Sequence, residues 1–181
     1  NKSNRILGSA KVPFSWNELK TLVCNNELDK MSRSKFEQDR YEAYMGKIRS
    51  EWVSVVDCIL CSKFGFDREL GVDILRSRDD LLIYRSRPMQ LLKALPSLDE
   101  VTFVQTSLCL NDFPYYVEDN VQHCCLWKLY EDINVNDIAA AKTELYKSLD
   151  VDDFIYFVNP PHLKSIPQID HAHIFIRLAD C

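Results

Sequence analysis

The four histidines of this sequence, His123, His162, His171 and His173, all lie in its last third. His171 and His173 are two positions apart in a segment that alternates like a strand, so their side chains share one face of it. Two imidazoles on one strand face can bind a metal ion, or bind and attack a phosphate group. An imidazole with an ordinary pKa of about 6.5 suits acid–base chemistry at neutral pH. We therefore predict that His173 is a nucleophile or general base and that His171 orients it.

Other polar side chains of the C-terminal half are expected to complete this site. Arg177 shares the strand face of the histidine pair, and His123 begins another expected strand, so both are expected to hold phosphate oxygens. Polar side chains near expected turns would fix the remaining polar parts of a ligand. The predicted ligand-binding residues are His123, Asn111, Asp112, Asn159, Ser165 and Arg177.

Two other interpretations of the histidines stay open. In the first, His171 and His173 are a structural pair bonded to the backbone and to a carboxylate such as Asp170, because clustered titratable groups also occur for structural reasons. In the second, His123 joins them in a three-histidine metal site. The preferred interpretation assigns no metal to the site and leaves any cofactor unknown.

The cysteines favour a packed, reduced interior over a disulfide or zinc framework. There are seven, an odd number, and six of them are expected in apolar surroundings. Cys58 and Cys61 fall in the apolar stripe of an expected helix, whereas Cys124 and Cys125 would point to opposite faces of a strand. These spacings do not supply four zinc ligands. Only four glycines are present and none forms a G-x-G pattern, so no phosphate-binding glycine loop is expected.

The first half of the chain has the periodicity of helices. Ser15 followed by Glu18 is a capping box, which predicts a helix over 16–25. A longer helix is expected to begin at Ser32 or Ser34, where apolar residues start to recur every three or four positions.

This second helix is expected to run toward Gly65 and to bend or break near 50–54. Its aromatic residues Phe36, Tyr44 and Trp52 are interpreted as a stripe that faces the core rather than a cofactor.

The C-terminal half changes to strand chemistry, with β-branched and aromatic residues between turn sequences. Residues 111–115 form a turn in which Asp112 is expected either to bond the loop backbone or to orient a histidine. A helix is expected over 137–149 with Asn136 as its N-cap. Strands are expected over 101–110, 121–130, 154–158 and 171–178.

Together these elements predict an α+β fold in which a helical N-terminal half packs on a small, mostly antiparallel sheet. The 181 residues are expected to form one domain, with a loose N-terminal arm over 1–13 and an irregular, charged insertion over 67–100. A chain of this length can bury a substantial core without disulfides or metals.

Charge and hydropathy restrict the class of protein. With 22 Lys and Arg against 27 Asp and Glu, the net charge is −5, which argues against a general binder of nucleic acid. No apolar run approaches the roughly 20 residues that a membrane span needs, and no leader is visible. We expect a cytoplasmic protein with no membrane partner.

Three blocks of sequence carry a resemblance to a known family. They are 15–20 with Leu28, 33–34, Tyr41 and 54–60; 110–115 with 123–128; and 156–159 with 164–166 and 171–174. In this order the sequence resembles the N-acetylglucosamine-induced protein family, which is found largely in fungi and has no assigned reaction. The family usually has Trp where this chain has Phe113, and the insertion over 67–100 does not match. The family name implies a link to the amino-sugar response.

A more distant similarity is to the histidine triad superfamily, whose members bind nucleotide phosphates and attack phosphorus with the middle histidine of a His-x-His-x-His strand. Asn159, Ser165, His171 and His173 occur here in the order that those proteins show. The third histidine is replaced by Phe175, and five residues separate the serine from the first histidine, more than in that motif. The likeness is an analogy and does not establish function.

We expect a protein that binds or processes a phosphorylated or nucleotide-linked small metabolite through the His-x-His site. The alternative is a non-enzymatic protein that binds a protein partner through the charged segment 67–100, with structural histidines. The sequence alone does not decide whether the protein is an enzyme.

Overall fold

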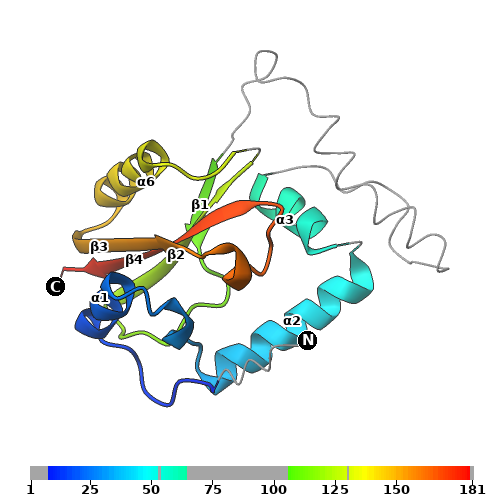
Figure 1. Ribbon diagram of the computed structural model, residues 1–181, viewed down its shortest axis with the longest axis horizontal. Helices are drawn as coiled ribbons and strands as arrows, with labels where there is room; N and C mark the ends of the chain where they lie inside the picture. Colours follow the sequence, from blue (N-terminus) through cyan, green and yellow to red (C-terminus); the bar gives the residue numbers. More distant parts are fainter. Residues whose placement is uncertain (1–7, 53, 65–105, 130, 180–181) are drawn as a thin grey trace, which may run out of the picture.

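The computed structural model describes residues 8–52, 54–64, 106–129 and 131–179. They form a four-stranded sheet in the order β1-β2-β4-β3, in which every neighbouring pair is antiparallel (Figure 1). The expected α+β class, with helices and an antiparallel sheet, is confirmed. The insertion expected over 67–100 lies outside the described residues. The strands are β1 (Thr106–Leu110), β2 (Val121–Lys128), β3 (Val151–Val158) and β4 (Asp170–Leu178).

The helices are divided between the two faces of the sheet (Figure 1). On one face α6 (Val135–Ser148) packs on the apolar residues of the central strands, such as Ala172 and Ile174 of β4. On the other face lie α1 (Trp16–Cys24), η1 (Leu28–Lys30), α2 (Lys35–Glu51), α3 (Val55–Phe64) and η2 (Pro161–Leu163).

The alternation of side chains along β4 explains this division. Successive residues of a strand point to opposite faces. Ala172, Ile174 and Ile176 therefore join the core under α6, whereas Phe175 joins the core under α1. His171 and His173 fall on the same face as Phe175. The expectation that the two histidines share a face opposite an apolar stripe is thus confirmed.

The helix starts follow the capping chemistry of the sequence. Ser15 and Glu18 cap the first turn of α1 reciprocally, as expected. Ser34, one of the two expected starts, accepts a hydrogen bond from the backbone N–H of Glu37 and opens α2. The long helix breaks between Glu51 and Val55, inside the expected interval.

Three details of the expected elements are wrong. The N-cap of α6 is Asn134, whose side chain accepts from the N–H groups of Asn136 and Asp137, so the helix begins two residues before the expected start. Phe36 is 71% exposed and Tyr44 lies at the surface, so these two residues of α2 do not form the expected core-facing stripe. Cys24, which was expected in apolar surroundings, is exposed. The stripe of α2 that turns inward comprises Tyr41, Met45 and Ile48.

The segment before α1 is attached to the rest of the molecule where it is described. The Ala10 N–H donates to the Arg33 carbonyl at 2.9 Å, and the Phe14 N–H donates to the Tyr116 carbonyl at 2.8 Å. The arm expected over 1–13 is therefore held at residue 10, while residues 1–7 lie outside the described part.

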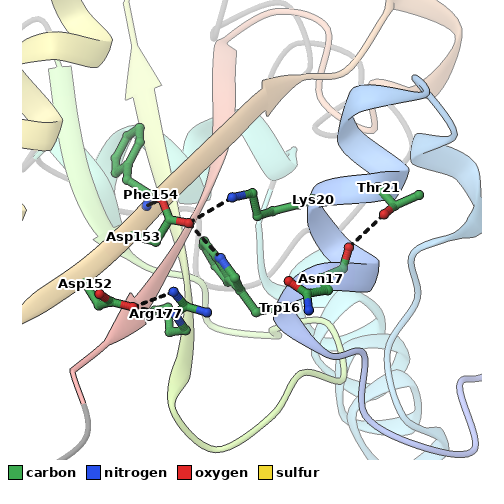
Figure 2. A network of polar contacts seen from close by, with 8 residues as sticks. All are labelled: Trp16, Asn17, Lys20, Thr21, Asp152, Asp153, Phe154 and Arg177. Atoms are coloured by element: carbon green, nitrogen blue, oxygen red, sulfur yellow. Dashed lines mark hydrogen bonds and ion pairs between the residues drawn. The ribbon is translucent and has the colours of Figure 1, made fainter.

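Helix α1 is tied to the sheet by a small polar network (Figure 2). The indole Nε1–H of buried Trp16 donates to a carboxylate oxygen of Asp153 on β3 at 2.9 Å, and Lys20 contacts the same oxygen at 3.1 Å. Arg177 on β4 pairs with Asp152 and places its guanidinium 5.6 Å from the Trp16 ring. No helix among the described residues is long and apolar enough to cross a membrane.

This network gives a first prediction. Trp16→Phe keeps most of the buried ring but leaves the Asp153 carboxylate without its indole donor, so we expect a loss of about 1–3 kcal/mol in the free energy of unfolding. Lys20→Ala, which removes an exposed partner of the same oxygen, is the control and should cost less than about 1 kcal/mol. Urea denaturation followed by far-UV circular dichroism measures both. Equal losses in the two variants would contradict the assigned importance of the indole bond.

Candidate functional site

A cleft of about 660 Å³ opens on the sheet face that carries the histidines. Its walls come from α2 and α3, from the segments around residues 28–33 and 109–115, and from residues of β2 and β4. Six of the eight residues predicted for the site line this cleft: Asn111, Asp112, Asn159, Ser165, His171 and His173. His123 and Arg177 are not among its lining residues.

His123 lies beneath the cleft surface, behind His173. Its Nε2 is 2.9 Å from Nδ1 of His173, and its Nδ1 accepts the backbone N–H of Tyr115 at 3.1 Å. A backbone N–H can only donate, so Nδ1 of His123 carries a lone pair and the neutral ring carries its proton on Nε2. That proton is donated to Nδ1 of His173, and neutral His173 therefore carries its own proton on Nε2.

His171 has the opposite arrangement. Its Nδ1 is 3.3 Å from the carbonyl oxygen of Ile169, which can only accept, so this nitrogen carries the proton. Its Nε2 then has a lone pair, and no group among the described residues hydrogen-bonds to it. The ring packs on Trp127 with centroids 4.5 Å apart, and its centroid is 5.5 Å from that of His173. The two neighbouring imidazoles thus carry one donor, on His173, and one acceptor, on His171.

Burial keeps these three imidazoles neutral. It lowers the pKa of His173 to about 3, and the neighbouring His171 and the positive charge of Arg33 make smaller contributions in the same direction. The pKa of His123 lies well below its usual value for the same main reason, and that of His171 is also lowered. The aromatic neighbours that exclude water from His173 include Phe157, whose ring stacks on it at 4.9 Å.

Arg33 supplies positive charge beside the imidazoles. Its Nε donates to the carbonyl oxygen of Phe113 at 2.8 Å, and its guanidinium lies 4.3 Å from the ring centre of Tyr41. The side chain is half-buried and lines the cleft. Within the described segments no group hydrogen-bonds to its two terminal nitrogens, so this end of the guanidinium is open to an acceptor. An arginine held in this way presents two parallel donors to a carboxylate or phosphate.

The other predicted residues have different partners from those expected. The Asp112 carboxylate pairs with Lys63 of α3 at 2.8 Å, and it is Asn111 that forms the local turn by accepting the N–H of Phe113. The expectation that Asp112 bonds the loop backbone or orients a histidine is wrong in this structure, because the lysine takes the charge. Arg177 pairs with Asp152 in the network beside Trp16, away from the cleft.

The amide of Asn159 approaches the histidine pair, and its Nδ2 lies 3.3 Å from Nε2 of His173. Exposed Ser165 lies at the rim of the same cleft. These two residues therefore line the same cleft as His171 and His173, and their role in ligand binding stays a prediction.

Three groups at the site were not identified from the sequence: Arg33, Lys63 and the backbone N–H of Tyr115. Arg33 stands immediately before Ser34, the N-cap of α2. The sequence indicated the cap, but no pattern of residues indicated that this arginine lines the same cleft as the histidines. Lys63 and Asp112 are 49 residues apart, and a backbone donor leaves no trace in the residue types.

The alternative of a three-histidine metal site has no matching arrangement in the described part of the chain. The facing nitrogens of His123 and His173 are bonded to each other, and the second nitrogen of His123 is taken by the backbone of Tyr115. No group of three or more His, Cys, Asp or Glu side chains surrounds a position for a metal ion among these residues.

The fold and the cleft define an α+β protein with helices on both faces of its sheet and a histidine-lined cleft on one of them. The chain belongs to the family described as "Protein of unknown function (DUF3605)", which matches residues 15–177. It is 25% identical over 187 residues to "N-acetylglucosamine-induced protein 1" of Candida albicans (strain SC5314 / ATCC MYA-2876), covering 93% of this chain and 70% of that protein. The resemblance inferred from the sequence is thereby confirmed.

One solved structure shares the fold. The protein in "Crystal Structure of HTC1" superimposes with a TM-score of 0.55 at 18% identity, over 92% of this chain and 86% of that one. At this identity the likeness supports the arrangement of helices and strands and nothing about function.

The buried imidazoles predict how stability depends on pH. Below the ordinary histidine pKa of 6.5 the unfolded chain binds protons that the folded chain, with its lowered pKa values, does not. The free energy of unfolding should therefore fall as pH falls from about 6.5 toward about 4.5, with up to about 1.4 kcal/mol per pH unit from each buried histidine. His173→Gln should have a shallower slope than the wild type, as measured by urea unfolding across this range.

His162→Gln, which removes an exposed histidine and leaves the cluster intact, is the matched control and should follow the wild-type curve. Coincident slopes for wild type and His173→Gln would show that His173 is protonated in the folded protein.

Proposed function

We propose that this protein binds a small phosphorylated metabolite in the cleft, with Arg33 contacting the phosphate and His171 and His173 contacting polar groups beside it. The observation that carries this proposal is the half-buried, cleft-lining side chain of Arg33, which is fixed through Nε to Phe113 and stacked on Tyr41, while its terminal nitrogens have no hydrogen-bond partner among the described residues. Fixing an arginine in advance lowers the entropy lost when it binds an oxyanion.

The rest of the cleft is consistent with such a ligand. Its volume, about 660 Å³, lies in the range of small-molecule sites. Aromatic side chains provide flat apolar walls, and amides and imidazoles provide a few fixed polar contacts. The aromatic lining residues are Tyr41, Tyr44, Phe113, Tyr115 and Trp127.

The relative from Candida albicans suggests where to begin the search for the ligand. Its name describes a protein induced by N-acetylglucosamine. A phosphorylated amino sugar combines an oxyanion for Arg33 with a ring for the aromatic walls, so N-acetylglucosamine 6-phosphate is a suitable first probe.

The hydrogen bonds also favour a change in the roles expected of the two histidines. A general base needs a lone pair, and the positions of the protons place that lone pair on Nε2 of His171. His173 carries a proton on the nitrogen that faces Asn159 and suits a hydrogen-bond donor. We therefore assign the acceptor role of the proposed site to His171 and the donor role to His173.

Isothermal titration calorimetry with N-acetylglucosamine 6-phosphate tests the proposal. Arg33→Gln should weaken binding roughly tenfold to a hundredfold, because charge-assisted hydrogen bonds contribute about 1.5–3 kcal/mol. Arg177→Gln removes an arginine from the same sheet face outside the cleft and should leave the affinity unchanged. Binding that is equally insensitive to both replacements would contradict the assignment of Arg33. An absence of heat with the wild-type protein, repeated with glucose 6-phosphate and adenosine monophosphate, would contradict phosphate binding in the cleft.

A further inference from the structure

We infer that the cleft selects phosphorylated ligands with a hydroxyl group close to the phosphate, and that buried His123 is the positioning residue that sets this preference. The inference rests on the proposed function for its phosphate and adds the chemistry of the neighbouring group. It follows from a chain of hydrogen bonds that fixes which nitrogen of each imidazole carries a proton.

This series of hydrogen bonds begins at a backbone N–H group, which can only donate. The backbone N–H of Tyr115 points at Nδ1 of His123 at 3.1 Å, which forces the His123 proton onto Nε2. Nε2 then donates to Nδ1 of His173 at 2.9 Å, which forces the His173 proton onto Nε2. Ring stacking holds the geometry: His123 lies 4.4 Å from Phe175, and His173 lies 5.7 Å from Tyr115 between ring centroids.

The proton on His173 Nε2 needs an acceptor. The nearest group is the amide of Asn159, which approaches with its nitrogen at 3.3 Å. Two donors that face each other do not form a hydrogen bond. An oxygen must therefore accept this proton, either the Asn159 amide oxygen after a half-turn of the amide or an oxygen of the ligand. A phosphate oxygen is the candidate acceptor, because Arg33 and His173 both line the cleft and Arg33 is close enough for its charge to lower the pKa of His173.

His171 requires the complementary group. Its Nδ1 is used by the Ile169 carbonyl, and its Nε2 lone pair has no hydrogen-bond partner within the described segments. A phosphate monoester, with a second pKa of about 6, is mostly a dianion without a proton near neutral pH, whereas a hydroxyl group always has a proton to donate to this lone pair. The centres of the two rings are 5.5 Å apart, so one small molecule can place an oxyanion at His173 and a hydroxyl group at His171. A phosphorylated sugar or polyol has this combination.

Nuclear magnetic resonance of the unliganded protein tests the proton positions. Long-range proton–nitrogen spectra of ¹⁵N-histidine-labelled protein should show protonated Nε2 in His123 and His173 and protonated Nδ1 in His171. In His123→Phe, which keeps a ring on Phe175 but removes both nitrogens, His173 should lose its single tautomer and populate both. His162→Gln is the control and should leave the other signals in place. A proton on Nδ1 of His173 in the wild type, or an unchanged His173 tautomer in His123→Phe, would overturn the role of His123.

Binding measurements test the selectivity with two ligands that each carry a phosphomethyl group on a six-membered ring. N-acetylglucosamine 6-phosphate carries ring hydroxyls, and cyclohexylmethyl phosphate carries none. We expect the wild type to prefer the sugar phosphate roughly fivefold to tenfold, as one additional hydrogen bond would give. His171→Phe, which keeps the stacking on Trp127, should remove this preference while its affinity for cyclohexylmethyl phosphate stays within about twofold of wild type. Should that variant not fold, His171→Asn replaces it, since its shorter amide can still donate to Ile169 but does not reach the position of Nε2.

The outcomes separate the inference from the proposed function. If both phosphates bind the wild type equally, or if His171→Phe weakens both to the same degree, the hydroxyl selectivity is wrong while phosphate binding stands. If neither phosphate binds, the proposed function fails and the selectivity fails with it, whatever the tautomers are.

Discussion

The burial of strand β4 on both faces is the constraint on which the candidate site depends. Its even-numbered residues, Ala172, Ile174 and Ile176, are sealed under α6, and its odd-numbered residues from His171 to Phe175 are buried on the opposite face. His171 and His173 are therefore only 4% and 7% exposed. An imidazolium ion would have to lose its hydration at these positions, so the rings stay neutral and act through hydrogen bonds instead of charge.

Neutral imidazoles make the positive charge of the cleft depend on another residue. Arg33 enters from the segment between η1 and α2, and it keeps its charge because a guanidinium does not lose its proton under ordinary conditions. Its fixed position comes from the turn that follows β1, where the Phe113 carbonyl accepts its Nε. The same turn supplies the Tyr115 N–H to His123. One loop therefore orients both the charged and the neutral parts of the site.

The sequence predicted those features whose causes are local. The capping box of α1, the break near residue 52 and the common face of His171 and His173 all follow from side-chain chemistry within a few positions. Features that depend on distant segments were not predictable in this way: Asp112 takes its partner from α3, and Phe36 is exposed because only one stripe of α2 meets the cleft. The tautomers of the histidines depend on backbone groups, which are the same in every residue type.

The attachment of α1 to β3 has a consequence for how the chain reaches its fold. Trp16 and its hydrogen-bond partner Asp153 are separated by 137 positions, and the apolar residues of α1 and η1 pack on Val121, Phe157 and Phe175. During synthesis the N-terminal helices leave the ribosome well before those strands exist. At about 5–20 residues per second, their apolar side chains stay exposed for roughly 7–30 seconds. Until β4 is complete, this surface is open to chaperones and to contacts between nascent chains.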